Sequence, residues 1–260
     1  MSQAEKGAAF AALHEGEPFL IPNPWDTGSA RVLEALGFRA LATTSSGFAF
    51  TLGRADGGAT LDELAAHVAA LSKATGLPLS VDLEDGYGDP PEAIRRMAEA
   101  GAVGGSIEDW ERSGSLLPQE QAAERVAAAA ETAHSLAFPF VLTGRAENHI
   151  RGNPDLDDTI ERLLAYERAG ADCLYAPGLR TREEIRAVCD AVGKPVNVLA
   201  VPTLSVAEIV EAGAQRISVG GGLTWVAMTA LADAATSIRD GDLSVLTGRS
   251  RVLDDALSER

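Results

Sequence analysis

The chain has 260 residues, and its 38 acidic against 22 basic side chains give a formal net charge of −16. Nucleic acids and anionic membranes would repel such a protein, which argues against both as partners. The composition, 46% hydrophobic and 23% charged, is that of a folded globular protein rather than a disordered or disulfide-scaffold chain. A small anionic substrate is still compatible with this charge if a bound divalent metal supplies local positive charge.

The two cysteines, Cys173 and Cys189, lack the spacing of a zinc site or a disulfide framework. The N-terminal segment lacks the basic region and apolar run of a signal peptide. No stretch of about 18 apolar residues exists that would span a bilayer. We therefore expect a soluble, cytoplasmic protein with free thiols.

Short β-rich runs alternate along the chain with longer segments rich in Ala, Leu, Glu and Arg. The predicted strands are Phe19–Pro22, Ala40–Thr44, Leu79–Glu84, Gly105–Glu108, Phe140–Arg145, Cys173–Ala176, Val196–Leu199 and Arg216–Val219. The predicted helices are Thr27–Leu36, Thr60–Thr75, Pro90–Ala100, Pro118–Ala137, Asp155–Ala169, Thr181–Val192, Ser205–Ala212 and Leu223–Asp240. Residues 241–260 form a C-terminal extension, in which Thr247–Arg260 is expected to be one more helix.

Local signals support these boundaries. Thr60, Thr181 and Ser205 each stand three residues before a glutamate, which is the spacing of a capping box. Strand runs such as LPLSVDLE are apolar on both faces, as parallel strands covered by helices are. Eight strand–helix units in one chain of this length predict a single-domain (β/α)₈ TIM barrel over residues 1–260, with a doubly wound open sheet as the alternative.

Acidic side chains gather at the predicted C-terminal ends of two neighbouring strands, where barrel enzymes build their active sites. Asp82 and Glu84 are two residues apart on one strand, so both are expected to face the same way, and Glu108 closes the next strand. Two unit charges about 4 Å apart cost roughly 4 kcal/mol at an effective dielectric of 20. Such a cluster requires a cation or raised pKa values, and its all-oxygen character suits Mg²⁺, with Mn²⁺ possible. The alternative is that these acids are solvated loop residues paired with arginines.

Two further strand ends carry groups suited to anions. The run TTSSGF offers hydroxyls and backbone N–H groups that could hold a carboxylate or phosphate, although a plain turn is an equal alternative. Arg145 ends an apolar strand, where it either pairs with the acids or clamps an anionic substrate. His14, His67 and His134 are expected on the surface, Cys173 in the core, and Gly220–Gly222 in a phosphate-binding or tight turn.

Several motifs occur together in one order: IPNPWDTGSARVLEALGFRALATTSSGFAFTLGRADG, SVDLEDGYG, GGSIEDW, LTGRAEN and ADCLYAPG. In this order they resemble the isocitrate lyase/phosphoenolpyruvate mutase superfamily, from about residue 17 to 225. The resemblance implies a (β/α)₈ barrel, a C-terminal helix swapped between subunits and a homo-oligomer built as a dimer of dimers. It also implies Mg²⁺ and chemistry on a 2-oxo acid or an enolpyruvate.

The resemblance also assigns expected roles to residues. Ser45, Ser46 and Gly47 match the segment that holds the pyruvyl carboxylate, and Arg145 matches the substrate-binding arginine. The metal set that the resemblance implies is Asp82 as a direct ligand with Glu84, Glu108 and Asp56 acting through water. Glu84 departs from the family pattern, which has aspartate at that position.

The loop after the fourth strand also departs from the family. Lyases of the family carry a KKCGH-like loop with a catalytic cysteine, whereas residues 110–118 contain none and place Gly114 or Ser115 at the mutase lid position. We expect a lyase or mutase acting on a small 2-oxo acid through an enolpyruvate intermediate, with carbon–carbon cleavage or decarboxylation favoured. The alternatives are phosphonomutase-type P–C chemistry and a non-catalytic 2-oxo-acid binding protein. Tyr87 and Ser115 are the candidate proton donors.

Overall fold

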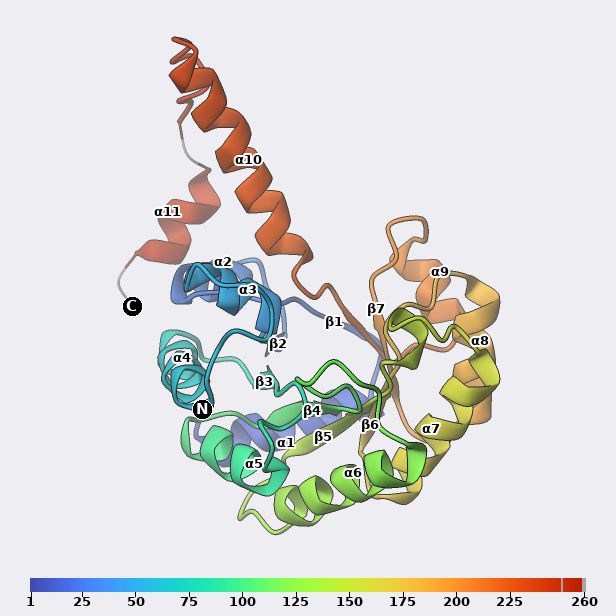
Figure 1. The fold of residues 1–260 in the computed structure, drawn as a ribbon. Helices are drawn as coiled ribbons and strands as arrows, with labels where there is room; N and C mark the ends of the chain where they lie inside the picture. Colours follow the sequence, from blue (N-terminus) through green and yellow to red (C-terminus); the bar gives the residue numbers. More distant parts are fainter. Residues whose placement is uncertain (249, 259–260) are drawn as a thin grey trace.

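The computed structural model describes residues 1–248 and 250–258, and its centre is an eight-stranded parallel sheet (Figure 1). The strand order is β1-β8-β7-β6-β5-β4-β3-β2, and Ala42 N of the last strand donates to Pro22 O beside the first at 3.1 Å. The sheet therefore closes into the expected (β/α)₈ barrel, and the open-sheet alternative is wrong. The strands are β1 Phe19–Ile21, β2 Leu41–Ala42, β3 Leu79–Asp82, β4 Gly104–Glu108, β5 Val141–Arg145, β6 Cys173–Tyr175, β7 Val196–Leu199 and β8 Arg216–Ser218.

Helices surround this barrel, each predicted helix being confirmed to within a few residues. The surrounding helices are α2 Thr27–Ala35, α4 Leu61–Ala74, α5 Pro90–Glu99, α6 Gln119–His134, α7 Leu156–Arg168, α8 Arg182–Ala191 and α9 Val206–Glu211. The last predicted helix, α10 Gly222–Arg239, follows β8 and leaves the barrel. Capping boxes form at Thr60, Thr181 and Ser205, where each hydroxyl accepts from the backbone of the glutamate three residues on. These caps satisfy N–H groups that have no partner inside the helix.

The N-terminal helix α1, Gln3–Glu15, was not predicted, and it closes the N-terminal end of the barrel. Its polar side chains bond the chain just before the strands, as Lys6 Nζ does to Thr75 O at 2.9 Å. Phe10 is fully buried there with Phe19 and Ile21. A Cβ on Gly104 would lie 2.6 Å from the Phe10 ring, so glycine is required where β4 passes this aromatic plug.

Two of the histidines expected on the surface lie elsewhere. His14 is buried in α1 with 8% exposure, and His67 is half-buried and stacked on Phe48 with ring centroids 4.0 Å apart. Burial lowers the pKa of His67 to about 4. Helical position alone did not reveal these contacts, because they come from α1 closing the barrel and from the short helix α3, Ser45–Thr51. His134 is exposed and Cys173 is buried, as expected.

The C-terminal helices leave the barrel. Figure 1 shows α10 projecting away from it, with α11, Arg251–Leu257, lying closer to α2. Trp225, Val226 and Leu231 on α10 are 47%, 68% and 62% exposed. The predicted C-terminal helix Thr247–Arg260 is present as the shorter α11. Residues 249, 259 and 260 of that prediction lie outside the described residues. No helix in the described ranges is long and apolar enough to cross a bilayer.

Candidate active site

Two adjoining cavities open at the C-terminal ends of the strands. The inner cavity has a volume of about 190 Å³ and reaches into the barrel, and the outer one has about 260 Å³. Ser45, Asp56 and Arg145 line both. Asp82 lines the inner cavity, whereas Glu84 and Glu108 line the outer one. The mouth of the barrel therefore gathers the acids and the arginine that the sequence singled out.

Asp82 is the last residue of β3, and its carboxylate contacts two neighbouring elements. Oδ2 accepts from Ser45 N at 3.2 Å, and Oδ1 accepts from Arg145 Nη1 at 3.3 Å. The spacing predicted that the strand continues to Glu84, and this was wrong. β3 ends at Asp82, and Glu84 has a φ of 51°. This left-handed turn is uncommon for a residue with a side chain, yet it still leaves the Glu84 carboxylate at the mouth.

Arg145 is the centre of the cluster. Its guanidinium forms ion pairs with Glu147 at 2.6 Å, Asp82 at 3.3 Å and Glu108 at 3.3 Å. Burial alone would lower the pKa of Arg145, but these three carboxylates raise it well above its usual value. Of the two interpretations open from sequence, pairing with the acids is thus observed, and the guanidinium still lines both cavities.

Burial raises the pKa values of two acids at the mouth, Glu108 and Glu84, because it disfavours their charged forms. Burial, followed by the charges of Glu147 and Asp82, raises the pKa of Glu108 to about 8 against the opposing effect of Arg145. Burial also raises the pKa of Glu84, which Arg112 partly opposes. A cation bound among these carboxylates would relieve that cost by stabilising their charged form.

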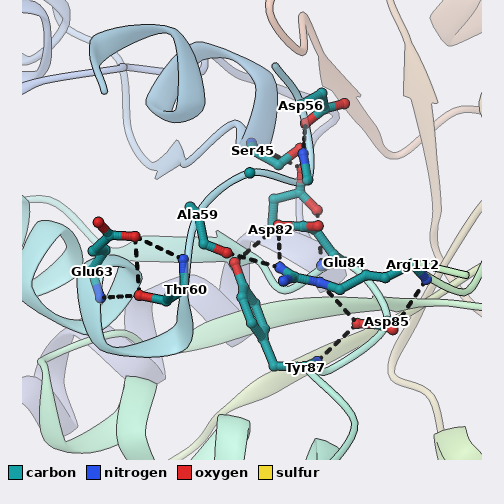
Figure 2. A network of polar contacts seen from close by, with 12 residues as sticks. Ser45, Asp56, Ala59, Thr60, Glu63, Asp82, Glu84, Asp85, Tyr87 and Arg112 are labelled. Atoms are coloured by element: carbon teal, nitrogen blue, oxygen red, sulfur yellow. Dashed lines mark hydrogen bonds and ion pairs between the residues drawn. The ribbon is translucent and has the colours of Figure 1, made fainter. Parts of the chain in front are cut away.

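Figure 2 shows the outer part of this network, between the β3 end and the loop after β4. Glu84 Oε1 accepts from the Tyr87 hydroxyl at 2.9 Å and from Arg112 Nη2 at 3.0 Å. The Arg112 guanidinium lies 3.9 Å from the centroid of the Tyr87 ring. Asp56 is exposed on the loop after α3 and also faces the cavities, with Oδ1 accepting from Gly57 N. Arg112 therefore ties the loop after β4 to an acid of the mouth.

The TTSSGF run is the start of helix α3 rather than a plain turn. Thr44 is its N-cap and accepts from Gly47 N at 3.3 Å, so the backbone of Gly47 is already committed. A Cβ on Gly47 would lie 2.6 Å from the Thr44 side chain, which leaves room only for glycine. Ser45 and Ser46 line the inner cavity, as does the glycine turn at Gly220 and Gly221 before α10.

The two candidate proton donors differ in position. The Tyr87 hydroxyl bonds Glu84 near the outer cavity, and burial raises its pKa, so it is a neutral hydroxyl. Ser115 is exposed in the loop after β4, where its hydroxyl donates to Glu111 at 3.0 Å, and it lines neither cavity. Tyr87 also lines neither cavity, so the difference between the two is that Tyr87 bonds an acid of the cluster and Ser115 does not.

Several residues of the site were not singled out from sequence. Glu147 is fully buried and joins Arg145 to Arg151, whose guanidinium lies 4.6 Å from the Trp110 ring centroid. Arg112 also belongs here. A signal for Glu147 exists in the sequence, because an acid two residues after Arg145 shares its strand end. Arg112 and Arg151 sit in irregular loops whose path no periodicity predicts.

The acids at the mouth are oxygen donors of the kind that bind Mg²⁺. In residues 1–248 and 250–258, no group of three or more His, Cys, Asp and Glu side chains is arranged as a ready-made metal centre. Mg²⁺, however, keeps several waters and needs only one or two carboxylates directly. An all-oxygen set of Asp82 with Asp56, Glu84 and Glu108 around two small cavities fits such a water-mediated site.

Comparisons with known proteins agree with this geometry. The sequence profile of the phosphoenolpyruvate phosphomutase family matches residues 10–239. The structure of a Burkholderia cenocepacia J2315 protein assigned as a lyase/mutase is 47% identical with a TM-score of 0.94, covering 99% of this chain and 97% of that one. A second protein of that organism, assigned as a phosphonomutase, is 36% identical with a TM-score of 0.84 over 93% of this chain and 100% of its own.

An oxaloacetate decarboxylase of Rhodopseudomonas palustris (strain HaA2) is 30% identical over 93% of this chain and 87% of its own length. The family profile covers the barrel and all the residues of the mouth described above. The chain therefore belongs to the phosphoenolpyruvate phosphomutase family, and it is an enzyme of the lyase and mutase class of the phosphoenolpyruvate mutase/isocitrate lyase superfamily.

Proposed function

We propose that this enzyme is a Mg²⁺-dependent lyase that cleaves or decarboxylates a small 2-oxo acid of the oxaloacetate type. The observation that carries the proposal is the cluster of Asp82, Glu84 and Glu108 around Arg145 at a barrel mouth of small volume. The similarity to an oxaloacetate decarboxylase over most of both chains supports the choice of reaction.

The metal would be held by Asp82 directly and by Glu84, Glu108 and Asp56 through water, with Mn²⁺ as a substitute. When bound, it supplies Lewis acidity that stabilises the negative charge developing beside the keto group. Arg145 holds the side chains of Asp82, Glu108 and Glu147 close together. That arrangement prepares the site before substrate arrives, so little reorganisation is needed during the reaction.

The chain itself would bind and orient the substrate. Ser45 and Ser46 would hold the pyruvyl carboxylate at the start of α3, with Gly47 positioning that turn through its bond to Thr44, and Arg145 would contact the reacting end. The loop of residues 110–118, tied to Glu84 through Arg112, would cover the cavity and exclude water. Tyr87 is the better placed proton donor, because its hydroxyl already bonds an acid of the cluster.

Phosphonomutase-type P–C chemistry is the second candidate, and the family profile and the relative assigned as a phosphonomutase favour it. One assay separates the two: incubate the enzyme and Mg²⁺ with oxaloacetate or with phosphonopyruvate. We expect pyruvate to accumulate from oxaloacetate and no phosphoenolpyruvate to form from phosphonopyruvate. Phosphoenolpyruvate formation would transfer the assignment to the second candidate. Turnover of neither substrate would overturn both candidates, and tight oxalate binding would then leave only a pocket for 2-oxo acids established.

We also propose a homo-oligomer, a dimer of dimers in which the C-terminal helical extension is exchanged between subunits together with α10, which precedes it. The exposed apolar side chains of Trp225, Val226 and Leu231 support this, because an isolated helix gains little by exposing them to water. Light scattering would give the mass of the assembly, and a charged Val226→Glu variant should lower it.

A further inference from the structure

The interior of this barrel is polar below the mouth. Barrel interiors are usually filled by bulky branched aliphatic side chains. Here the inner cavity is lined by Ser80, Ser106, Asn197, Ser218 and Arg216, from four different strands. These groups lie on the inner side of the site and are not used by the chemistry proposed above.

Arg216 forms the floor of the inner cavity. It begins β8 and is only 5% exposed. Its Nε donates to Asn197 Oδ1 on the neighbouring β7 at 2.9 Å, and Nη2 donates to Thr143 Oγ1 on β5 at 3.0 Å. Because β5 lies three strands away from β8, the guanidinium crosses the barrel interior. Nη1 contacts His14 Nε2 of α1 at 3.1 Å.

All three partners are neutral. His14 Nδ1 lies 2.8 Å from Phe10 O, so that nitrogen carries the proton and Nε2 accepts from Arg216. Burial and then the Arg216 charge lower the pKa of His14 to about 3, which keeps the ring uncharged. Burial raises the pKa of the nearby Cys173 thiol, so it is no counter-ion either.

The charge of Arg216 is therefore not balanced locally. Among the described residues no carboxylate forms an ion pair with it, and only three of its five N–H donors are used. Burying an unpaired charge is costly, and such charges in proteins are normally paired. Arg145 differs in that three carboxylates already surround it.

We propose that the floor of the inner cavity is a subsite for a carboxylate, held by the free edge of the Arg216 guanidinium. Resting on the proposed function, we assign this carboxylate to the distal end of a dicarboxylic 2-oxo acid, whose reacting end lies at the mouth. A cavity of about 190 Å³ that runs from Ser45 to Arg216 joins the two positions. The subsite would then select dicarboxylic over monocarboxylic 2-oxo acids.

The first test uses formate as a carboxylate probe and an Asn197→Asp variant. The new carboxylate would stand 2.9 Å from Arg216 Nε and act as a built-in counter-ion, with Ser218 able to donate to it. Thermal unfolding is followed against sodium formate, with sodium gluconate keeping the ionic strength constant because it is too large for the cavity. We expect formate to raise the midpoint of the wild type and of a Ser106→Ala control, but not of Asn197→Asp.

An equal formate response in wild type and Asn197→Asp, or none in the wild type, would overturn the subsite. If Asn197→Asp does not fold, Arg216→Gln replaces it, and it too should lose the response.

The second test identifies the source of the carboxylate. Formate should compete with oxaloacetate for turnover, and Asn197→Asp should raise KM at least tenfold while kcat changes less than threefold. If formate binds at Arg216 but does not compete with oxaloacetate, the site binds a free anion, and the assignment to a carboxylate of the substrate is overturned. Absence of any turnover would remove the proposed function and that assignment with it, while the formate response alone would decide the subsite.

Discussion

Arg145 and Arg216 both project into the barrel interior, yet their surroundings are opposite. Arg145 at the mouth is shared by Asp82, Glu108 and Glu147, so its surroundings carry net negative charge. Arg216 at the floor bonds only neutral acceptors. The mouth is therefore suited to a cation and the floor to an anion. One small cavity thus offers the two charges that a chelating, dicarboxylic substrate would require.

The largest expected effect concerns the mouth. Replacing Asp82 by Ala removes the carboxylate that we propose as the direct metal ligand, and turnover of oxaloacetate with Mg²⁺ should fall by about 10²–10³-fold, as loss of one charge-stabilising group does. Arg145 keeps Glu108 and Glu147, so the barrel should fold. The exposed Glu92→Ala variant serves as the control and should retain full turnover. Normal activity of Asp82→Ala would show that the Asp82 carboxylate is not the metal ligand that we propose.

A variant at Glu147 tests whether the buried ion pairs at the mouth contribute to the stability of the protein. Glu147→Gln leaves Arg145 and Arg151 without their shared, fully buried carboxylate. Breaking a buried pair costs about 3–5 kcal/mol, and the lower end applies because Arg145 retains two other acids. Urea denaturation should show this loss, whereas Asp62→Asn, which breaks an exposed pair with Arg96, should cost less than about 1 kcal/mol. An equal loss of stability in the two variants would show that the buried ion pair at the mouth contributes no more than an exposed pair on the surface.

The pH dependence of stability reports on the same acids. The pKa of Glu108 is raised from 4.5 to about 8 in the folded protein, so between these values the native state binds more protons than the unfolded chain. Glu108 should therefore make the free energy of unfolding of the metal-free enzyme fall as pH rises through this window, by at most about 1.4 kcal/mol per pH unit. The lowered pKa values of the buried His14 and His67 act in the opposite direction below about pH 6.5, so the effect is measured as the difference between wild type and Glu108→Gln. The wild-type curve should fall relative to the Glu108→Gln curve, and added Mg²⁺ should oppose that fall. A difference that rises over this window would contradict the prediction.

The smallest expected effect concerns the floor. Arg216→Met removes a charge that has no carboxylate partner, and leaves Asn197, Thr143 and His14 without their donor. Each buried acceptor left without a donor costs about 1–3 kcal/mol, but removing an unpaired buried charge offsets part of that cost, so we expect a net loss smaller than that of Glu147→Gln. Chemical denaturation in gluconate buffer measures this cost. A loss larger than that of Glu147→Gln would show that Arg216 is mainly structural.

Sequence reasoning reached the barrel because parallel strands and amphipathic helices carry local signals, such as the capping boxes at Thr60, Thr181 and Ser205. It gave no bounds for α1, because Gly7 and the paired alanines on either side of Phe10 leave little contrast between the apolar and polar faces of that helix. It also continued β3 to Glu84, because periodicity does not reveal a left-handed residue.

The candidate site was predictable to the same extent. The acids and Arg145 stand at strand ends, so their meeting at the mouth followed from the topology of the fold. The partners of Arg216 could not be predicted in this way, because they come from β5, β7 and α1 and meet only when the barrel closes. Nor does spacing show that Ser115 bonds Glu111 away from the cavities.

The aromatic plug of α1 has a consequence for how the interior is hydrated. Phe10 packs against Gly104, and His14 contacts Arg216, so α1 covers the guanidinium on the N-terminal side of the barrel. Shortening α1 would admit bulk solvent from below, and the charge at the floor would be screened. The N-terminal helix thus closes the barrel behind Arg216, and the inner cavity leaves the guanidinium open to an anion that enters from the mouth.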